Sequence, residues 1–298
     1  MVSVERIHEY SELQLEAPFT MHVDEEIDEN WPASPTIIVK DLAVRYRSTL
    51  PLCLDGLSFA IGAGERVGVV GRTGSGKSSM VLALLRLLEI ENGSIEVDGV
   101  NISSIGLHRL RTAIAVIPQT PFLFSGCTVR ENLDPFNKYG DDIIWDALKS
   151  VQMIDTIEAL PLKLDAAVAD GGQNFSVGQR QLLCLARAVL LHNNIIILDE
   201  PSANVDSKTD VLLQRTLRER FAHATIISIA HRLDTIISSD NVIVLSDGKL
   251  VEFGSPCDLL SKQGGHFLSL VQSTGDAMST SLINRAFARE DFALVSMA

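Results

Sequence analysis

The sequence has no apolar run long enough to span a membrane. Its two richest apolar stretches, residues 81–88 and 182–191, are each interrupted by an arginine, Arg86 and Arg187. Both are shorter than the roughly 20 residues that a membrane-crossing helix needs. No apolar segment follows the charged residues near Met1, so the pattern of a secretory signal is also missing. These 298 residues therefore predict no membrane-spanning helix.

Cysteine is scarce, and its spacing does not match that of a zinc site. The four cysteines, Cys53, Cys127, Cys184 and Cys257, lie far apart and form no C-x-x-C pair. This spacing argues against a zinc site and against a disulfide framework. We therefore expect reduced thiols, as in a cytosolic compartment.

Positive charge is also in deficit, with 25 Lys and Arg against 38 Asp and Glu and a net charge of -13. A nucleic-acid binder would need the opposite sign, because Lys and Arg contacts to phosphates supply most non-specific affinity. Nine of the acidic residues but only one basic residue lie within residues 1–31. We interpret this segment as a solvated leader rather than a docking segment. Two prolines make residues 30–35 a linker.

Hydrophobic residues make up 46% of the chain and charged residues 21%, as in ordinary globular proteins. Several strand-like runs are continuously apolar, and helical patterns lie between them, which predicts a parallel sheet covered on both faces. The first runs are joined by short glycine-containing turns, at Asp55-Gly56 and residues 62–64, which predicts antiparallel strands at one edge. The predicted strands cover residues 37–46, 57–61, 66–70, 94–98, 113–117, 195–198, 225–230 and 242–245.

The order of these patterns suggests a division of the chain. Residues 1–35 form the leader and linker, residues 36–274 the main domain, and residues 275–298 a weakly patterned tail to which we assign no function. The largely helical pattern between two of the strands predicts an inserted helical subdomain at about residues 120–190. A hairpin, with its turn at residues 246–249, is expected near the end of the main domain.

The strongest chemical signal is Gly71-Arg72-Thr73-Gly74-Ser75-Gly76-Lys77-Ser78, which matches the phosphate-binding pattern G-x-x-x-x-G-K-[ST]. An apolar run precedes the motif, and a helical pattern over residues 79–88 follows it. In such a loop, glycines let backbone amides surround a polyphosphate, Lys77 reaches the terminal phosphates, and the Ser78 hydroxyl is offered to Mg²⁺. The motif predicts nucleotide binding, and a glycine-rich turn without function is the alternative.

A second signal is the apolar run 195–198, which ends in Asp199 and Glu200. Open α/β sheets bind their ligands at the carboxyl ends of the strands. There, Asp199 can hold the water shell of Mg²⁺ and Glu200 can polarise an attacking water. An apolar run followed by two acids is commonplace, but a P-loop upstream in the same sheet favours the functional interpretation.

The remaining motifs resemble those of one family, the ATP-binding cassette (ABC) ATPases. They occur in the order of that family and cover roughly residues 36–273. Phe175-Ser176-Val177-Gly178-Gln179 resembles the signature sequence, Gln119 the Q-loop, Ser202-Ala203-Asn204-Val205-Asp206 the D-loop, His231 the switch histidine, and Tyr46 the aromatic residue that stacks on adenine.

This resemblance implies an α/β fold: a P-loop NTPase of the ABC ATPase type with a mixed sheet core, an antiparallel β edge subdomain and an inserted α-helical subdomain. It implies ATP and Mg²⁺ as ligands, with Glu200, His231 and Lys77 in catalytic roles. The implied metal ligands are Ser78, Gln119 and Asp199. The residues implied to contact nucleotide are Tyr46, Gly71, Thr73, Gly74, Ser75, Gly76, Lys77, Ser78, Ser79 and Gln119 and, across a dimer interface, Ser176, Gly178 and Gln179.

Each of these residues also has an ordinary structural interpretation. Taken alone, His231 would be a structural histidine and Tyr46 would be strand packing. Ser176 and Gly178 would form a helix N-cap, since apolar residues follow at helical spacing. In the family that the chain resembles, the same helix N-terminus points at the γ-phosphate of the partner domain, where the positive end of its dipole is favourable.

Finer details resemble the second nucleotide-binding domain of C-subfamily exporters, the multidrug-resistance-associated kind. They are residues 119–126, residues 128–135, Glu200, and Val177, which stands in place of the middle glycine of the signature. Pro201 departs from this pattern, in which alanine is expected. Residues 2–10 and 16–18 resemble the segment after the last membrane helix of such exporters. The chain is thus expected to be the cytosolic end of a transporter whose membrane part is absent.

The resemblance implies ATP hydrolysis that drives export through partner transmembrane domains, in a dimer with another nucleotide-binding domain of the first-cassette type. The chain would lie at the cytosolic face of a plasma membrane or of a vacuole- or lysosome-like membrane, held there only through these partners. A DNA-repair or translation ATPase is one alternative, but residues 77–176 show no sustained heptads, and the chain has one cassette and a negative charge. The other is a regulatory fragment that binds ATP without productive turnover or transport.

Overall fold

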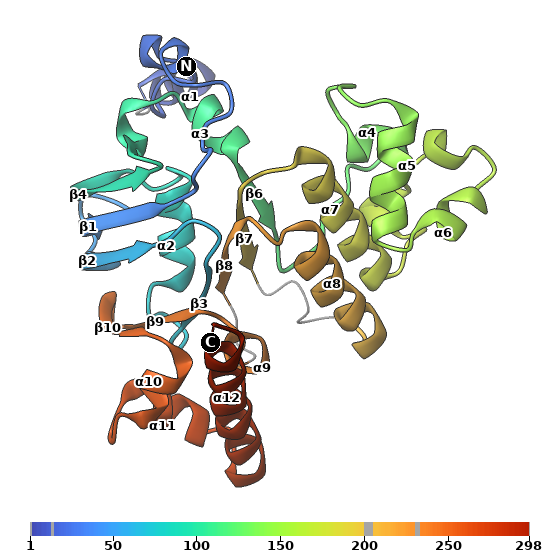
Figure 1. Ribbon diagram of the computed structural model, residues 1–298. Coiled ribbons are helices and arrows are strands. Elements are labelled where there is room, and N and C mark those ends of the chain that lie inside the picture. Colours follow the sequence, from blue (N-terminus) through green and yellow to red (C-terminus); the bar gives the residue numbers. More distant parts are fainter. Residues whose placement is uncertain (1, 13–14, 200–204, 230–232, 298) are drawn as a thin grey trace.

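The computed structural model describes residues 2–12, 15–199, 205–229 and 233–297. Within them the chain forms two sheets, with helices between and around them (Figure 1). Glu200, His231 and residues Ser202 to Asn204 of the predicted D-loop lie outside the described residues.

The larger sheet has six strands, and its apolar runs are buried as the sequence predicts. Five neighbouring strands are parallel, and the edge strand β10 pairs antiparallel with β9. The order is β10 (Lys249–Gly254), β9 (Asn241–Ser246), β3 (Arg66–Val70), β8 (Thr225–Ile229), β7 (Ile195–Asp199) and β6 (Ile114–Ile117). In the hairpin β9–β10, Asp247 and Gly248 both have positive φ, as a tight two-residue turn between twisted strands requires.

The smaller sheet is antiparallel, which confirms the predicted edge subdomain. Its order is β2 (Leu54–Ile61), β1 (Ile37–Val44), β4 (Ile90–Val97) and β5 (Val100–Asn101). Asp55-Gly56 lies inside β2 and is not the turn that the sequence suggested, since the pairing of β2 with β1 extends back to Leu54.

Helix α2 (Lys77–Leu84) follows the P-loop and shares an apolar cluster with both sheets, to which it contributes Met80, Val81, Ala83 and Leu84. The helix ends four residues earlier than the helical pattern predicts. Arg86 adopts a positive φ of 48°, and its buried guanidinium donates to the backbone oxygens of Ile102 and Ile105, both at 3.0 Å. These tertiary hydrogen bonds override the local pattern.

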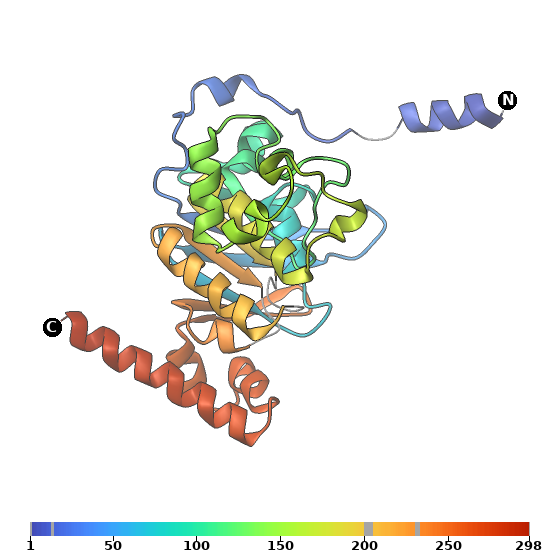
Figure 2. The ribbon, with the colours of Figure 1, turned by 90° about the vertical axis from the view of Figure 1, so that its right-hand side faces the viewer.

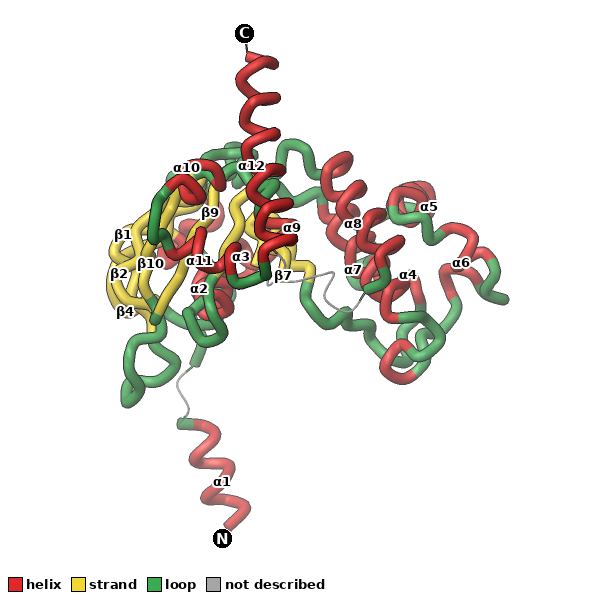
Figure 3. The backbone as a smooth tube through the Cα atoms, turned by 90° about the horizontal axis from the view of Figure 1, so that it is seen from below, coloured by secondary structure: helices red, strands yellow, loops and turns green. Residues whose placement is uncertain are grey.

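The helical region between β6 and β7 has its own apolar cluster, and Figure 3 shows its helices gathered to one side of the sheets. Within helix α5 (Asp141–Ser150) and at its C-cap, Ile144, Ala147, Leu148 and Val151 are buried, whereas Ile143 is exposed. The elements are α4 (Val129–Leu133), α5 (Asp141–Ser150), α6 (Ile154–Glu158), the 3-10 turns η3 (Lys163–Asp165) and η4 (Asp170–Gly172), and α7 (Val177–Leu191). Helix α8 (Ser207–Arg220) packs beside α7.

The C-terminal helices form a third cluster, with Phe267 and Val271 wholly buried in it. They are α9 (Leu233–Ile236), α10 (Pro256–Ser261), α11 (His266–Gln272) and α12 (Asp276–Met297). The weakly patterned tail is therefore a helix, with Leu282 and Ala286 facing the cluster. No helix in the described part of the chain combines the length and apolar character that crossing a membrane requires.

The acidic leader is only in part the solvated segment that the sequence predicts. Helix α1 (Val2–Ser11) stands apart from the body of the domain (Figure 2). Residues 15–31, which include the 3-10 turn η1 (His22–Glu25), instead run along the surface of the body. They contact the start of helix α3 (Leu107–Ala113), which follows the turn η2 (Ile102–Ser104), and Trp31 is only 7% exposed. Trp31 belongs to the linker that composition predicts. Its ring packs into the apolar cluster that includes residues of the small sheet.

Candidate functional site

The P-loop joins the end of β3 to the start of α2, and its glycines are required by its shape. Gly76, the N-cap of α2, has a φ of 105°, and a Cβ there would lie 2.7 Å from the Leu54 side chain. A Cβ at Gly71 would lie 2.3 Å from the Leu245 backbone oxygen. Any larger residue at either position would therefore strain or displace the loop.

Lys77 begins α2 and folds back over the loop. Its side chain is 6% exposed, and Nζ donates to the backbone oxygens of Gly71 at 2.7 Å and Arg72 at 3.1 Å. Burial lowers the pKa of Lys77 below its ordinary value of 10.5, and the nearby charge of Asp199 partly offsets this. A lysine ammonium beside the first amides of a helix, which have no partner within that helix, makes a site suited to phosphate groups.

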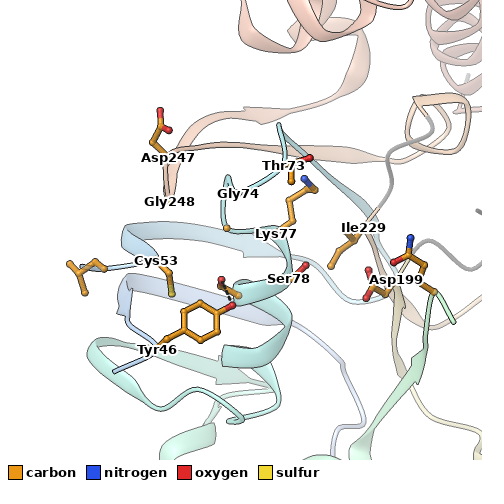
Figure 4. Close-up of a pocket in the computed structure, with 14 residues that line it drawn as sticks. Tyr46, Cys53, Thr73, Gly74, Lys77, Ser78, Asp199, Ile229, Asp247 and Gly248 are labelled. Carbon is orange, nitrogen blue, oxygen red and sulfur yellow. Dashed lines mark hydrogen bonds between the residues drawn. The ribbon is translucent and has the colours of Figure 1, made fainter. Parts of the chain in front are cut away.

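A cavity of about 420 Å³ opens beside the loop (Figure 4). On one side lies Tyr46, half exposed, whose hydroxyl is 3.0 Å from Ser79 Oγ. On the other side lie the residues at the ends of the parallel strands. The lining consists of Tyr46, Leu52, Cys53, Thr73, Gly74, Gly76, Lys77, Ser78, Ser79, Gln119, Asp199, Ile229, Asp247 and Gly248.

The three residues predicted as metal ligands line this cavity together. Ser78 lies in the first turn of α2, Gln119 follows β6, and Asp199 ends β7. The parallel pairing of β6 with β7 brings the last two to the same edge of the sheet. One carboxylate with neutral oxygens fits Mg²⁺, which proteins hold through one or two carboxylates together with substrate phosphates. No cluster of three or more His, Cys, Asp or Glu that could hold a metal occurs among the residues described.

The predicted signature lies at the start of α7 and does not line this cavity. Ser176 is the N-cap: its Oγ accepts from the Gln179 backbone at 3.1 Å, and Gln179 Oε1 accepts from the Ser176 backbone at 2.9 Å. Val177 is 38% exposed, and Gly178 packs near Asp206 and Thr209 at the start of α8. The structure thus keeps Ser176, Gly178 and Gln179 apart from the P-loop of their own chain.

Sequence reasoning missed the residues that the β9–β10 turn brings to the cavity. Gly248 donates its backbone N–H to the Ser75 oxygen at 3.1 Å and accepts from Asp55 at 2.8 Å. The turn itself was predicted, but its place beside the P-loop depends on the pairing of β9 with β3. No local signal in the sequence could have shown this.

A second missed residue is Gln181, which is completely buried in α7. Its Nε2 donates to the backbone oxygen of Pro118 at 3.1 Å, directly before Gln119. Its Oε1 is buried with no hydrogen-bond partner among the described residues. Gln181 thereby joins the signature helix to the chain that carries Gln119.

Comparisons with known proteins agree with this geometry. The profile of the ABC transporter family matches residues 54–203. The chain is 48% identical over 96% of its length to human ATP-binding cassette sub-family C member 4, and 49% identical over 90% to rat sub-family C member 2. It is 46% identical over 91% to ABC transporter C family member 9 of Arabidopsis thaliana. It spans 21%, 17% and 18% of the lengths of these relatives.

A solved structure described as a bacterial Atm1-family ABC exporter with ATP bound superposes with a TM-score of 0.80. The match is 29% identical in sequence and covers 92% of this chain and 47% of that one. The mixed sheet, the antiparallel edge sheet and the inserted helices are therefore those of a P-loop ABC ATPase. The chain belongs to the ABC transporter family and matches nucleotide-binding domains of its C subfamily.

Proposed function

We propose that this chain binds ATP with Mg²⁺ and hydrolyses it, and that the reaction powers export of a substrate through partner transmembrane domains. One observation carries the proposal: a single cavity is lined by the P-loop, by Tyr46 on one side and by Gln119 and Asp199 on the other. An aromatic ring, a phosphate loop and oxygen ligands are the three kinds of group that a nucleotide with its metal needs.

The proposed role of each residue follows from its chemistry. Tyr46 stacks on the adenine, and the loop amides with Lys77 bind the terminal phosphates. Ser78, Gln119 and Asp199 would hold Mg²⁺, which when bound neutralises charge on the phosphates. Glu200 accepts a proton from the attacking water, and His231 holds that water and the γ-phosphate in register.

Ser176, Gly178 and Gln179 have no place at this cavity, and we propose that they serve a second nucleotide. The exposed N-terminus of α7 would face the P-loop of a partner nucleotide-binding domain, and the partner would supply its own signature to the cavity described above. Val177 makes the signature of this chain the weaker one, so the partner is of the first-cassette type. The assembly lies at the cytosolic face of a membrane and contacts it through the transmembrane domains.

The test is ATP binding and phosphate release by the purified chain, alone and with a first-cassette domain, with magnesium or with a chelator. We expect magnesium-dependent binding and hydrolysis that the partner stimulates. Lys77→Ala should weaken ATP binding because it removes the buried cation, whereas the exposed control Lys262→Ala should not. Equal ATP affinity of Lys77→Ala and the wild type would contradict the assignment of the P-loop.

A further inference from the structure

Residues 16–31, which we call the strap, bind the body of the domain at the start of α3. The backbone N–H groups of Leu107 and His108 donate to the oxygens of Pro18 at 3.1 Å and Phe19 at 2.9 Å. The N–H of Gly106 donates to Asp24 Oδ1 at 2.8 Å. The first N–H groups of a helix have no partner within it, so the strap supplies the acceptors that α3 lacks.

The C-terminal end of the strap, at Asp28 and Trp31, is also bound to the body of the domain. The buried Trp31 ring donates from Nε1 to the Val97 oxygen at 3.1 Å, and the Arg109 guanidinium lies 6.0 Å from the ring centroid. Arg109 also donates to the backbone oxygen of Asp28. Two arginines of α3, Arg109 and Arg111, thus reach the strap from one helix.

Arg111 connects the strap to the P-loop helix. Its Nη2 and Nη1 bind the two carboxylate oxygens of Glu16 at 2.9 and 3.2 Å. From the same guanidinium, Nε donates to the Leu85 oxygen at 3.1 Å and Nη2 to the Arg86 oxygen at 3.0 Å. Leu85 is the C-cap of α2. One cation therefore satisfies carbonyls at the end of α2 and is itself held by the strap.

This arrangement has a consequence at the other end of α2. The helix has eight residues, a length of about 12 Å, and it begins with Lys77 and Ser78. A short hydrogen-bonded helix moves as a unit, and a cation at its C-terminus is favourable to its dipole. Displacement of the carbonyl end therefore displaces the end that binds phosphate.

We propose that Arg111 is a positioning residue for the P-loop helix, and that Glu16 of the strap holds Arg111 in place. Seating of the strap then sets the affinity of the P-loop for ATP. Lysine cannot replace Arg111, because a single ammonium cannot hold a carboxylate in bidentate fashion and bind two carbonyls in the same plane. This inference rests on the proposed nucleotide binding.

The experiment compares Glu16→Ala, Arg111→Lys and the double variant with the wild type, in the full chain. The matched control is Glu96→Ala, which removes the ion pair with Lys40 (2.8 Å) on the small sheet, away from α2. The readouts are ATP affinity in magnesium and thermal unfolding. A third is hydrogen exchange, without nucleotide, of the amides of residues 85–88, which are bonded to carbonyls of α2.

We expect each single variant to weaken ATP binding about three- to tenfold and to speed exchange at residues 85–88. The double variant should lose little more than one single variant, since both changes break one connection. The control should leave affinity and exchange unchanged. A purely structural role would lower the melting temperature without changing affinity, and this outcome, or additive losses in the double variant, would overturn the proposal.

The exchange readout separates this proposal from the proposed function. If the wild type bound no ATP, the proposed function would fail, while exchange at residues 85–88 would still report whether the strap holds α2. If ATP bound normally and exchange at these residues were the same in all variants, the strap proposal alone would be wrong.

Discussion

The buried side chain of Gln181 donates to the backbone oxygen of Pro118 at 3.1 Å, and through this bond the signature helix is joined to the residue that precedes Gln119. The bond spans 63 residues of sequence and links two groups that serve different nucleotides in the proposed dimer. The oxygen of the same side-chain amide, Gln181 Oε1, has no hydrogen-bond partner within the described ranges.

Gln181→Met tests this link. Methionine has a similar volume and removes the unpartnered oxygen, which offsets part of the cost of leaving the Pro118 oxygen unbonded, so we expect a loss of only about 1 kcal/mol in the free energy of unfolding. Turnover should fall severalfold while ATP affinity stays near that of the wild type. Chemical denaturation and phosphate release measure the two effects, with the exposed Gln272→Met as control. Full turnover in a folded Gln181→Met protein would show that the link is structural only.

Glu200→Gln separates binding from hydrolysis. The amide keeps the shape of the carboxyl but cannot accept a proton, so ATP should still bind and turnover should fall by about 10²-fold or more. Single-turnover phosphate release in the presence of the first-cassette partner is the measurement, and the exposed Glu91→Gln is the control. If mutant and wild type released phosphate equally fast, Glu200 would not be the base.

The pH dependence of ATP affinity follows from the buried Lys77. Its pKa in the free protein lies below 10.5 because burial disfavours the charged form, and bound phosphates raise the pKa again by favouring that form. Affinity should therefore be greatest at low pH and fall as pH rises through the lowered pKa of the free protein. Titration of ATP between pH 7 and about 11 measures this decline.

Tyr46 provides the control for this titration, because it lines the same cavity as Lys77 and its hydroxyl is 3.0 Å from Ser79 Oγ. Tyr46→Phe should leave the position of the decline unchanged. A decline that moved with Tyr46→Phe, or that began only above 10.5, would contradict the assignment to Lys77.

The sequence predicts the elements around the P-loop well because their signals are local. The bounds predicted for β3, residues 66–70, are those observed, and the antiparallel edge sheet and inserted helices are confirmed. Continuous apolar runs could be read as buried strands because the apolar residues of β3, β7 and β9 are buried on both faces. Gly71 and Gly76 could be identified because the motif itself specifies where a side chain would not fit.

What could not be predicted depends on contacts between distant residues. The strap is polar, so composition indicates a solvated segment. Asp24 nevertheless binds Gly106, the N-cap of α3, and Glu16 binds Arg111 in α3, partners that lie 82 and 95 residues away in sequence. Arg86 ends α2 early through bonds to carbonyls that only the folded chain brings near. The place of Gly248 beside Ser75 likewise requires the strand order of the finished sheet.

The last prediction concerns Val177, the first residue of α7, which is 38% exposed. In the proposed dimer, the N-terminus of α7 approaches the nucleotide of the partner. A valine side chain there crowds the backbone approach to the γ-phosphate and restricts the φ and ψ angles that glycine leaves open. Homodimers should therefore close poorly, and the isolated chain should hydrolyse ATP slowly unless a first-cassette domain with an unmodified signature is added.

Val177→Gly should raise the rate of the isolated chain severalfold by favouring a symmetric closed dimer. Glycine in a helix costs up to about 1 kcal/mol, so Val211→Gly, at a position 69% exposed on α8, controls for helix destabilisation and should not raise the rate. The measurement is the dependence of phosphate release on protein concentration, because a dimer-limited rate rises steeply with it. If the wild-type chain alone already ran at full, cooperative speed, and neither the partner domain nor Val177→Gly changed it, the asymmetric pairing would be wrong. A homodimer with two equivalent sites would then account for the activity, since the exposed start of α7 would be competent with valine in place.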